Sequence, residues 1–168
     1  MDEVVAVLAR EQVALEHLLF RLHHAKGVLA ADDERFLAMA ADELETAAHT
    51  VRELEATRAR VVSCTSESGT LRSLADGAPE PYGSLLQEHR TALGRLAGEI
   101  GAMLESTQVL AADRLAEIKG ERPGTYRRLR RRRRNDDDLD RAVAAAGYES
   151  VLAASSSLRL PSLVSFLG

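Results

Sequence analysis

The sequence predicts an all-α fold: an antiparallel helical hairpin and coiled-coil bundle of three long helices, followed by an amphipathic C-terminal tail. Of its 168 residues, 27 are alanine and 25 are leucine, two of the strongest helix formers. Aromatic residues make up only 4% and tryptophan is absent, a composition that disfavours β-sandwiches and β-barrels. Apolar residues also recur with a period of seven, which is typical of helices packed along a seam.

The first helix is expected from Val4 to Leu29. A 3.5-residue spacing keeps one seam against a partner helix along the whole length. Glu11 is the one charged member of this seam, and we expect it to reach the seam's edge or to pair with an arginine rather than to act in catalysis. The seam consists of Val4, Leu8, Glu11, Leu15, Leu18, Leu22, Ala25 and Leu29.

The second helix is expected from Glu34 to Val62, with Asp32 or Asp33 as its N-cap. Small side chains let helices approach closely, and the connection at residues 30–33 is short enough to make the first two helices antiparallel neighbours. The apolar stripe of this helix is richer in alanine than the first seam: Phe36, Leu37, Ala40, Leu44, Ala47, Val51, Leu54 and Val61.

The third helix is expected from Pro81 to Lys119, after a break in which residues 71–74 form one short turn. Two interleaved series keep a period of seven. Three glycines inside the helix indicate either close packing or flexibility, because each weakens a helix by about 1 kcal/mol relative to alanine. The series are Leu86, Leu93 and Ile100, then His89, Leu96, Met103 and Leu110, and the glycines are Gly94, Gly98 and Gly101.

Charge divides the chain into a bundle (1–119), a linker (120–138) and a tail (139–168). Residues 1–120 hold 12 Lys and Arg against 20 Asp and Glu, whereas residues 121–168 hold 10 against 6. Seven arginines lie within Arg127–Arg134, and Asp136–Asp138 follow almost at once. The acidic residues neutralise much of the arginine field within a Debye length of about 8–10 Å, which favours a solvated linker over docking or nucleic-acid contact.

The sequence favours neither enzymatic chemistry nor a cofactor. It has no phosphate-binding glycine loop, no Gly-x-Ser-x-Gly elbow and no Glu-x-x-His pair of the kind that holds metal in helical bundles. Cys64 is the single cysteine, which excludes an internal disulfide and a multi-thiolate metal site. The sequence contains no run of about 18 apolar residues, so we expect no membrane span. Its first residues are acidic and lack the basic region of a signal peptide. We therefore expect a cytoplasmic protein.

The tail is apolar enough to need a partner. Seven of its last eleven residues, counting Pro161, are apolar. Such a terminus either docks on its own bundle or is buried in another protein. The charged linker would let the tail extend far enough to bind another protein.

Four stretches together resemble the FlgN family of flagellar type III export chaperones, in particular its actinobacterial members. They are the leucine-rich opening Leu8-x-x-Glu11 through Leu19, Leu54-Glu55-x-x-Arg58, Leu85-Leu86-x-Glu88-His89-Arg90 through Ile100, and Gly147-Tyr148 followed by Pro161-Ser162-Leu163-x-x-Phe166-Leu167. Their order covers nearly the whole chain. The arginine block departs from the family's pattern.

The resemblance implies a cytoplasmic, non-enzymatic chaperone that binds hook–filament junction proteins, keeps them unassembled and delivers them to the flagellar export machinery. The family's client-binding region would fall on Leu139, Val143, Val151, Leu152, Leu158, Leu160, Leu163, Val164, Phe166 and Leu167. The alternative is a coiled-coil adaptor or homo-oligomer without a role in secretion.

Overall fold

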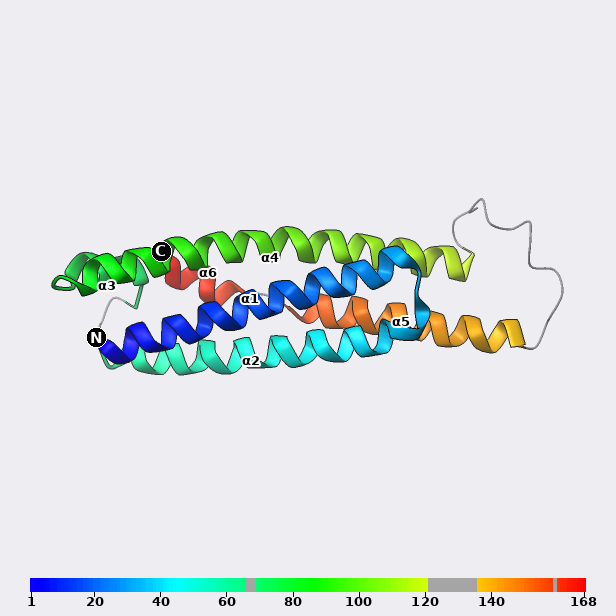
Figure 1. Ribbon diagram of the computed structural model, residues 1–168, viewed down its shortest axis with the longest axis horizontal. Coiled ribbons are helices and arrows are strands. Elements are labelled where there is room, and N and C mark those ends of the chain that lie inside the picture. The colour runs from blue at the N-terminus through cyan, green and yellow to red at the C-terminus, as the bar shows by residue number, and fades with distance from the viewer. Residues whose placement is uncertain (66–68, 121–135, 159) are drawn as a thin grey trace. The chain divides into compact units, whose positions relative to one another are not determined.

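The computed structural model describes residues 1–65, 69–120, 136–158 and 160–168, and all regular elements in these ranges are helical (Figure 1). The predicted all-α class is confirmed. The elements are α1 (Asp2–Ala31), a short 3-10 helix η1 (Glu34–Phe36), α2 (Leu37–Ser63), α3 (Leu71–Gly77), α4 (Tyr82–Lys119), α5 (Asp136–Ser157) and α6 (Pro161–Leu167).

These helices build two compact units. Unit 1 comprises Met1–Phe20, Thr46–Ala102 and Arg159–Gly168, and unit 2 comprises Arg21–Glu45 and Met103–Leu158. The long helices α1, α2 and α4 each contribute to both. We expected a separate tail, but α5 belongs to unit 2 and α6 to unit 1, because each has an apolar face that its unit buries. Most of the expected linker, residues 121–135, lies outside the described residues.

The predicted seam of α1 is confirmed at every position. Val4, Leu8, Glu11, Leu15, Leu18, Leu22, Ala25 and Leu29 are each at most 1% exposed. A seam buried over this length needs helices beside all of α1, and α2 and α4 supply them. The edge position expected for Glu11 is wrong, since its side chain is fully buried, but its expected pairing with an arginine is confirmed by its contact with Arg58.

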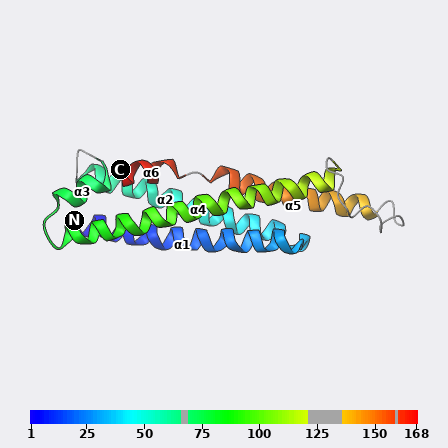
Figure 2. The same ribbon diagram turned by 90° about the horizontal axis from the view of Figure 1, so that it is seen from above.

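Side-chain pairs give the directions of the three long helices. In unit 1, Glu11 pairs with Arg58, and in unit 2 Arg21 pairs with Glu43 at 2.8 Å, so α2 runs antiparallel to α1. Two further pairs join α1 to α4, each across 80 residues: Tyr82 donates to Asp2 in unit 1, and Lys26 donates to Ser106 in unit 2. Helix α4 therefore runs parallel to α1 (Figure 2), and the 80-residue offset of the two pairs gives the same register in each unit.

The start of the second helix differs from the expectation. Phe36 is exposed, because it ends the 3-10 turn that precedes α2. Asp33 makes no side-chain capping bond; its two carboxylate oxygens instead accept bonds of 2.9 Å from Arg35. Asp32 has a positive φ of 56°, a conformation that aspartate tolerates better than most residues.

Helix α5 packs into the core of unit 2 and is hydrogen-bonded to it. The Tyr148 hydroxyl donates a 2.6 Å hydrogen bond to Asp32 Oδ1 at the α1–η1 turn, while the ring is fully buried. Burial, together with this bond, raises the pKa of Tyr148 far above its ordinary value, so the phenol remains a donor. One residue earlier, Gly147 faces Leu37 so closely that an added Cβ would lie 2.9 Å from the Leu37 Cβ.

The glycines within α4 have a different environment. A Cβ built on Gly94, Gly98 or Gly101 would meet nothing within 4 Å. Close packing, one of the two expected explanations, is therefore wrong for all three.

Alanine substitutions should separate the two kinds of glycine. Gly98→Ala should raise the free energy of unfolding by about 0.5–1 kcal/mol, because it removes backbone entropy from the unfolded chain in an open helical position. Gly147→Ala should lower it by about 1–3 kcal/mol, because the new methyl overpacks against Leu37. Urea unfolding followed by circular dichroism measures both, and equal shifts for the two variants would contradict the packing described.

Candidate binding surfaces

The ten residues expected to bind a client fall into three groups. Three side chains are largely exposed: Leu139 (67%), Val143 (62%) and Val164 (61%). Three are partly buried: Leu152, Leu160 and Leu167. Four are buried within the protein's own units: Val151, Leu158, Leu163 and Phe166. The structure therefore does not bring the ten together on one surface.

Helix α5 has an exposed apolar stripe as well as its buried face. Residues spaced by four, three, four and three positions lie on one side of an α-helix, and five exposed residues follow that spacing. They are Leu139, Val143, Ala146, Ser150 and Ala153, which we call the α5 stripe. The Ser150 hydroxyl donates to the Ala146 carbonyl at 2.8 Å, so it does not need a partner's acceptor.

The opposite face of α5 holds the helix in place. Ala144, Tyr148 and Val151 are buried in the unit 2 core. Lys119 donates to Glu149 at 3.0 Å and Gln108 donates to the Ser155 carbonyl at 3.1 Å, which tie α5 to α4. A helix that is apolar on two faces can pack against two partners. In α5 one face is packed against the core of unit 2, which fixes the helix in place, and the α5 stripe on the other face is exposed to solvent.

The second surface lies in unit 1, where α6 docks. Leu163 and Phe166 are buried, and Arg90 of α4 donates to the Leu167 carbonyl at 2.9 Å. Helix α6 also packs on α3, whose N-cap is Thr70; the Thr70 hydroxyl accepts a hydrogen bond from the Ser73 amide. The short turn expected near residues 71–74 is thus a helix of seven residues.

Beneath α6 lies a charge cluster that consists of the buried side chains of Glu11 and Arg58 and the partly buried side chain of Glu55. Arg58 Nη1 donates to Glu11 Oε1, and the two side chains are 3% and 0% exposed. The Arg58 guanidinium also lies 4.4 Å from the centre of the Phe166 ring. Within the described residues, the buried atoms Glu11 Oε2 and Glu55 Oε1 have no hydrogen-bond partner. The cluster therefore carries one more acid than base.

This environment perturbs Glu11. Burial raises the pKa of its carboxyl above the ordinary value of 4.5, and the charge and hydrogen bond of Arg58 lower it again. Glu55 adds a further rise, because a second negative charge disfavours ionisation. Burial prevails, and the pKa is raised.

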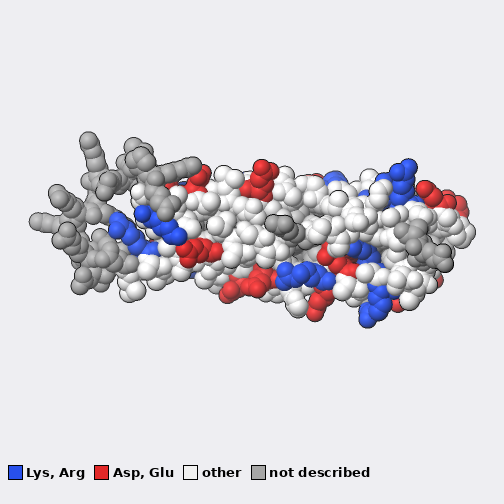
Figure 3. All heavy atoms as spheres, turned by 180° about the vertical axis from the view of Figure 1, so that it is seen from behind, with Lys and Arg blue, Asp and Glu red and all other residues white. Residues whose placement is uncertain are grey.

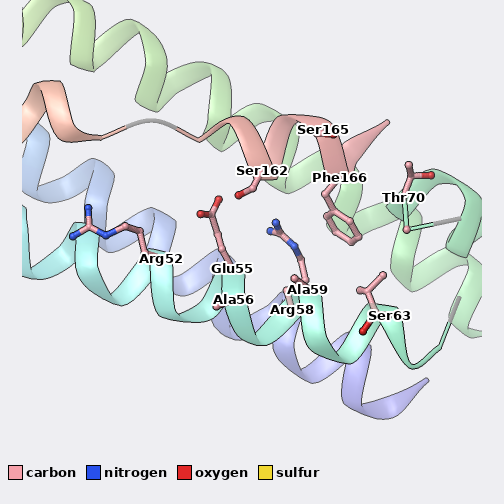
Figure 4. Close-up of a pocket in the computed structure, with 12 residues that line it drawn as sticks. Arg52, Glu55, Ala56, Arg58, Ala59, Ser63, Thr70, Ser162, Ser165 and Phe166 are labelled. Carbon is pink, nitrogen blue, oxygen red and sulfur yellow. The ribbon is translucent and has the colours of Figure 1, made fainter. Parts of the chain in front are cut away.

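A groove of about 820 Å³ opens beside the cluster, between α2 and α6. Figure 4 shows Glu55 and Arg58 pointing from α2 toward Ser162 and Phe166 of α6. The groove is lined by Arg52, Glu55, Ala56, Arg58, Ala59, Val62, Ser63, Gly69, Thr70, Ser162, Ser165 and Phe166.

The remaining sequence candidates give no site. Arg127–Arg134 lies outside the described residues. On the face shown in Figure 3, basic and acidic side chains of the described residues are interspersed among uncharged ones. Within the described ranges, no group of three or more His, Cys, Asp and Glu side chains is placed to hold a metal ion. Cys64 is exposed.

One described segment, Leu139–Leu167, is long and apolar enough by composition to cross a membrane, although we expected no span. Buried helices of soluble proteins satisfy the same criterion. In the structure this segment is divided between α5 and α6, and each helix buries one face.

No family model, curated protein or solved structure matches the chain. The resemblance to export chaperones therefore depends on the sequence motifs alone.

Sequence reasoning missed several residues of both surfaces. The alternating spacing of four and three could have identified Ser150 and Ala153, but small residues in an alanine-rich helix gave no reason to select them. Glu55 and Arg58 were noted only as part of a motif. Their meeting with Glu11, on another helix, had no local signal.

Removing one partner of the buried ion pair should lower the free energy of unfolding far more than replacing both partners with apolar residues. Arg58→Met leaves Glu11 buried without its donor, and we expect a loss of about 3–5 kcal/mol in unfolding free energy at neutral pH. The loss should shrink as pH falls, because protonation of Glu11 removes the unpaired charge. Adding Glu11→Leu should restore most of the stability. Thermal unfolding of the three proteins at pH 5 and 7.5 tests this, and a double variant no better than the single one would contradict it.

Proposed function

We propose that this protein is a non-enzymatic, cytoplasmic chaperone that holds a hook–filament junction protein unassembled before flagellar export. Two points support the proposal: the FlgN-like sequence motifs and the α5 stripe. The α5 stripe is the structural observation that supports the proposal, because it is an exposed apolar face of a helix whose opposite face is packed into its unit.

The chemistry of the stripe fits an amphipathic helix of the client. From Leu139 to Ala153 an α-helix rises about 21 Å, enough to contact roughly four turns of a partner helix. Alanine and serine at the centre permit close approach of the two backbones, while Leu139 and Val143 supply larger apolar contacts at one end. Covering the client's apolar face would keep it from assembling.

The stripe also favours reversible binding. It is narrow and holds only two large apolar side chains, so the binding free energy left after the loss of translational and side-chain freedom is small. A chaperone that must release its client at the export machinery needs such an affinity. The four buried residues expected to bind a client are already used in the protein's own packing, so in this conformation they do not form a binding surface.

Polar substitutions on the stripe test the proposal without disturbing the cores. Leu139→Ser with Val143→Ser should reduce binding to a junction protein at least tenfold, because the two largest apolar contacts are lost. Helical content should be unchanged, since both side chains face solvent. Calorimetric titration of candidate junction proteins with the full chain measures the effect.

Val109→Ser is the matched control, because Val109 is an exposed valine of unit 2 outside the stripe. It should bind like the unsubstituted chain. Equal affinity of the stripe variant would refute the assignment of the surface. If no junction protein binds, and light scattering shows an oligomer that the stripe substitutions dissociate, the coiled-coil adaptor becomes the better account.

A further inference from the structure

The excess acid beneath α6 poses a physical problem. Glu11 and Glu55 each have a buried oxygen without a partner among the described residues, and Arg58 can neutralise only one carboxylate. Burying a net charge is costly unless a counter-charge is taken up. A proton on Glu11, whose pKa is raised by burial, would balance the cluster and supply a donor for an unpartnered oxygen.

The docking of helix α6 depends most directly on the charge of this cluster. Its seven residues are too few to form a stable helix alone, so it stays helical only while it is docked. One of its two buried side chains, Phe166, rests on Arg58, and Ser162 lies across the groove from Glu55 (Figure 4). When α6 leaves, Phe166 no longer covers Arg58, and water gains greater access to the cluster.

We propose that α6 is a proton-linked latch, which docks on unit 1 when the Glu11–Arg58–Glu55 cluster holds one proton and detaches more readily when both carboxyls are ionised. The latch does not depend on the proposed chaperone function. If that function holds, detachment would also uncover Leu163 and Phe166, two of the residues expected to bind a client.

The charged groups around the cluster are few. The charges that act on Glu11 are those of Arg58 and Glu55, both from α2. Arg52 of α2 lines the same groove, and α4 brings Arg90, which is engaged by the last two carbonyls of the chain. The side chains of α6 itself include no ionisable group.

The direction of the pH dependence follows from linkage. At a pH below the carboxyl pKa of both states, the docked and detached forms are both protonated and docking is insensitive to pH. Because burial raises the carboxyl pKa, the docked state keeps its proton to a higher pH than the detached state, and between the two pKa values docking weakens as pH rises, by up to about tenfold per pH unit. The dependence ends where the docked cluster ionises.

A single tryptophan can report on the latch, because the chain has none. Phe166→Trp places an indole over Arg58, a geometry that favours the cation–π contact. In the full chain, acrylamide quenching of this indole should increase as pH rises from 4.5 to 8. Adding Glu55→Gln, which removes the excess acid, should abolish most of the pH dependence and keep the indole protected.

His89 supplies the matched control. It is a half-buried titratable group of α4 whose pKa is lowered by burial, and it lies outside the cluster. His89→Gln should leave the quenching transition in place. In the chain with Phe166 intact, amide hydrogen-exchange protection of Val164–Leu167, corrected for base catalysis, should fall with pH and become flat in Glu55→Gln. Protection that is independent of pH, or equally dependent in Glu55→Gln, would overturn the latch.

Discussion

The continuous apolar seam of α1 is the constraint on which the other elements depend. Its eight members are buried from Val4 to Leu29, so α1 must have neighbours along its entire length. An antiparallel α2 and a parallel α4 meet this need, and both therefore contribute to unit 1 and to unit 2. The remaining helices bury the apolar surface that the three long helices leave uncovered. Helix α5 completes the core of unit 2, and α3 and α6 complete the core of unit 1.

The one charge in the seam has a different role from its apolar neighbours. A leucine seam alone tolerates a slip of one helix along another, because every seven residues present the same surface. Glu11 breaks this equivalence, since its carboxylate meets Arg58 in only one register. A slip of one turn would bury both charges without partners, at a cost of several kcal/mol. The pair thus selects the register of α1 and α2 in unit 1, whatever its net contribution to stability.

Periodicity predicted which faces are buried better than it predicted what covers them. The whole α1 seam follows from spacing alone, and spacing together with cap and breaker residues predicts the ranges of α1, α2 and α4 to within a few residues. Phe36 was misplaced because a 3-10 turn shifts the phase of the stripe before α2 begins. The tail's position had no local signal: Gly147 against Leu37 and Tyr148 with Asp32 are contacts between residues more than a hundred positions apart. The α5 stripe obeys a visible spacing, yet sequence cannot show that the opposite face of the same helix is already occupied.

Because the C-terminal segment both completes the cores and presents a surface, its two roles cannot be separated by deletion. Removing residues after Lys119 would take Ala144, Tyr148 and Val151 out of unit 2. A loss of binding would then report unfolding as much as a lost contact. The same reasoning limits how a partner can bind. Intramolecular docking has the advantage of a high effective concentration, so a partner that must displace Val151 or Tyr148 competes against the protein's own core. A partner that uses the α5 stripe meets no such competition, and for this reason we propose the exposed face of α5, rather than the most apolar residues of the tail, as the binding surface.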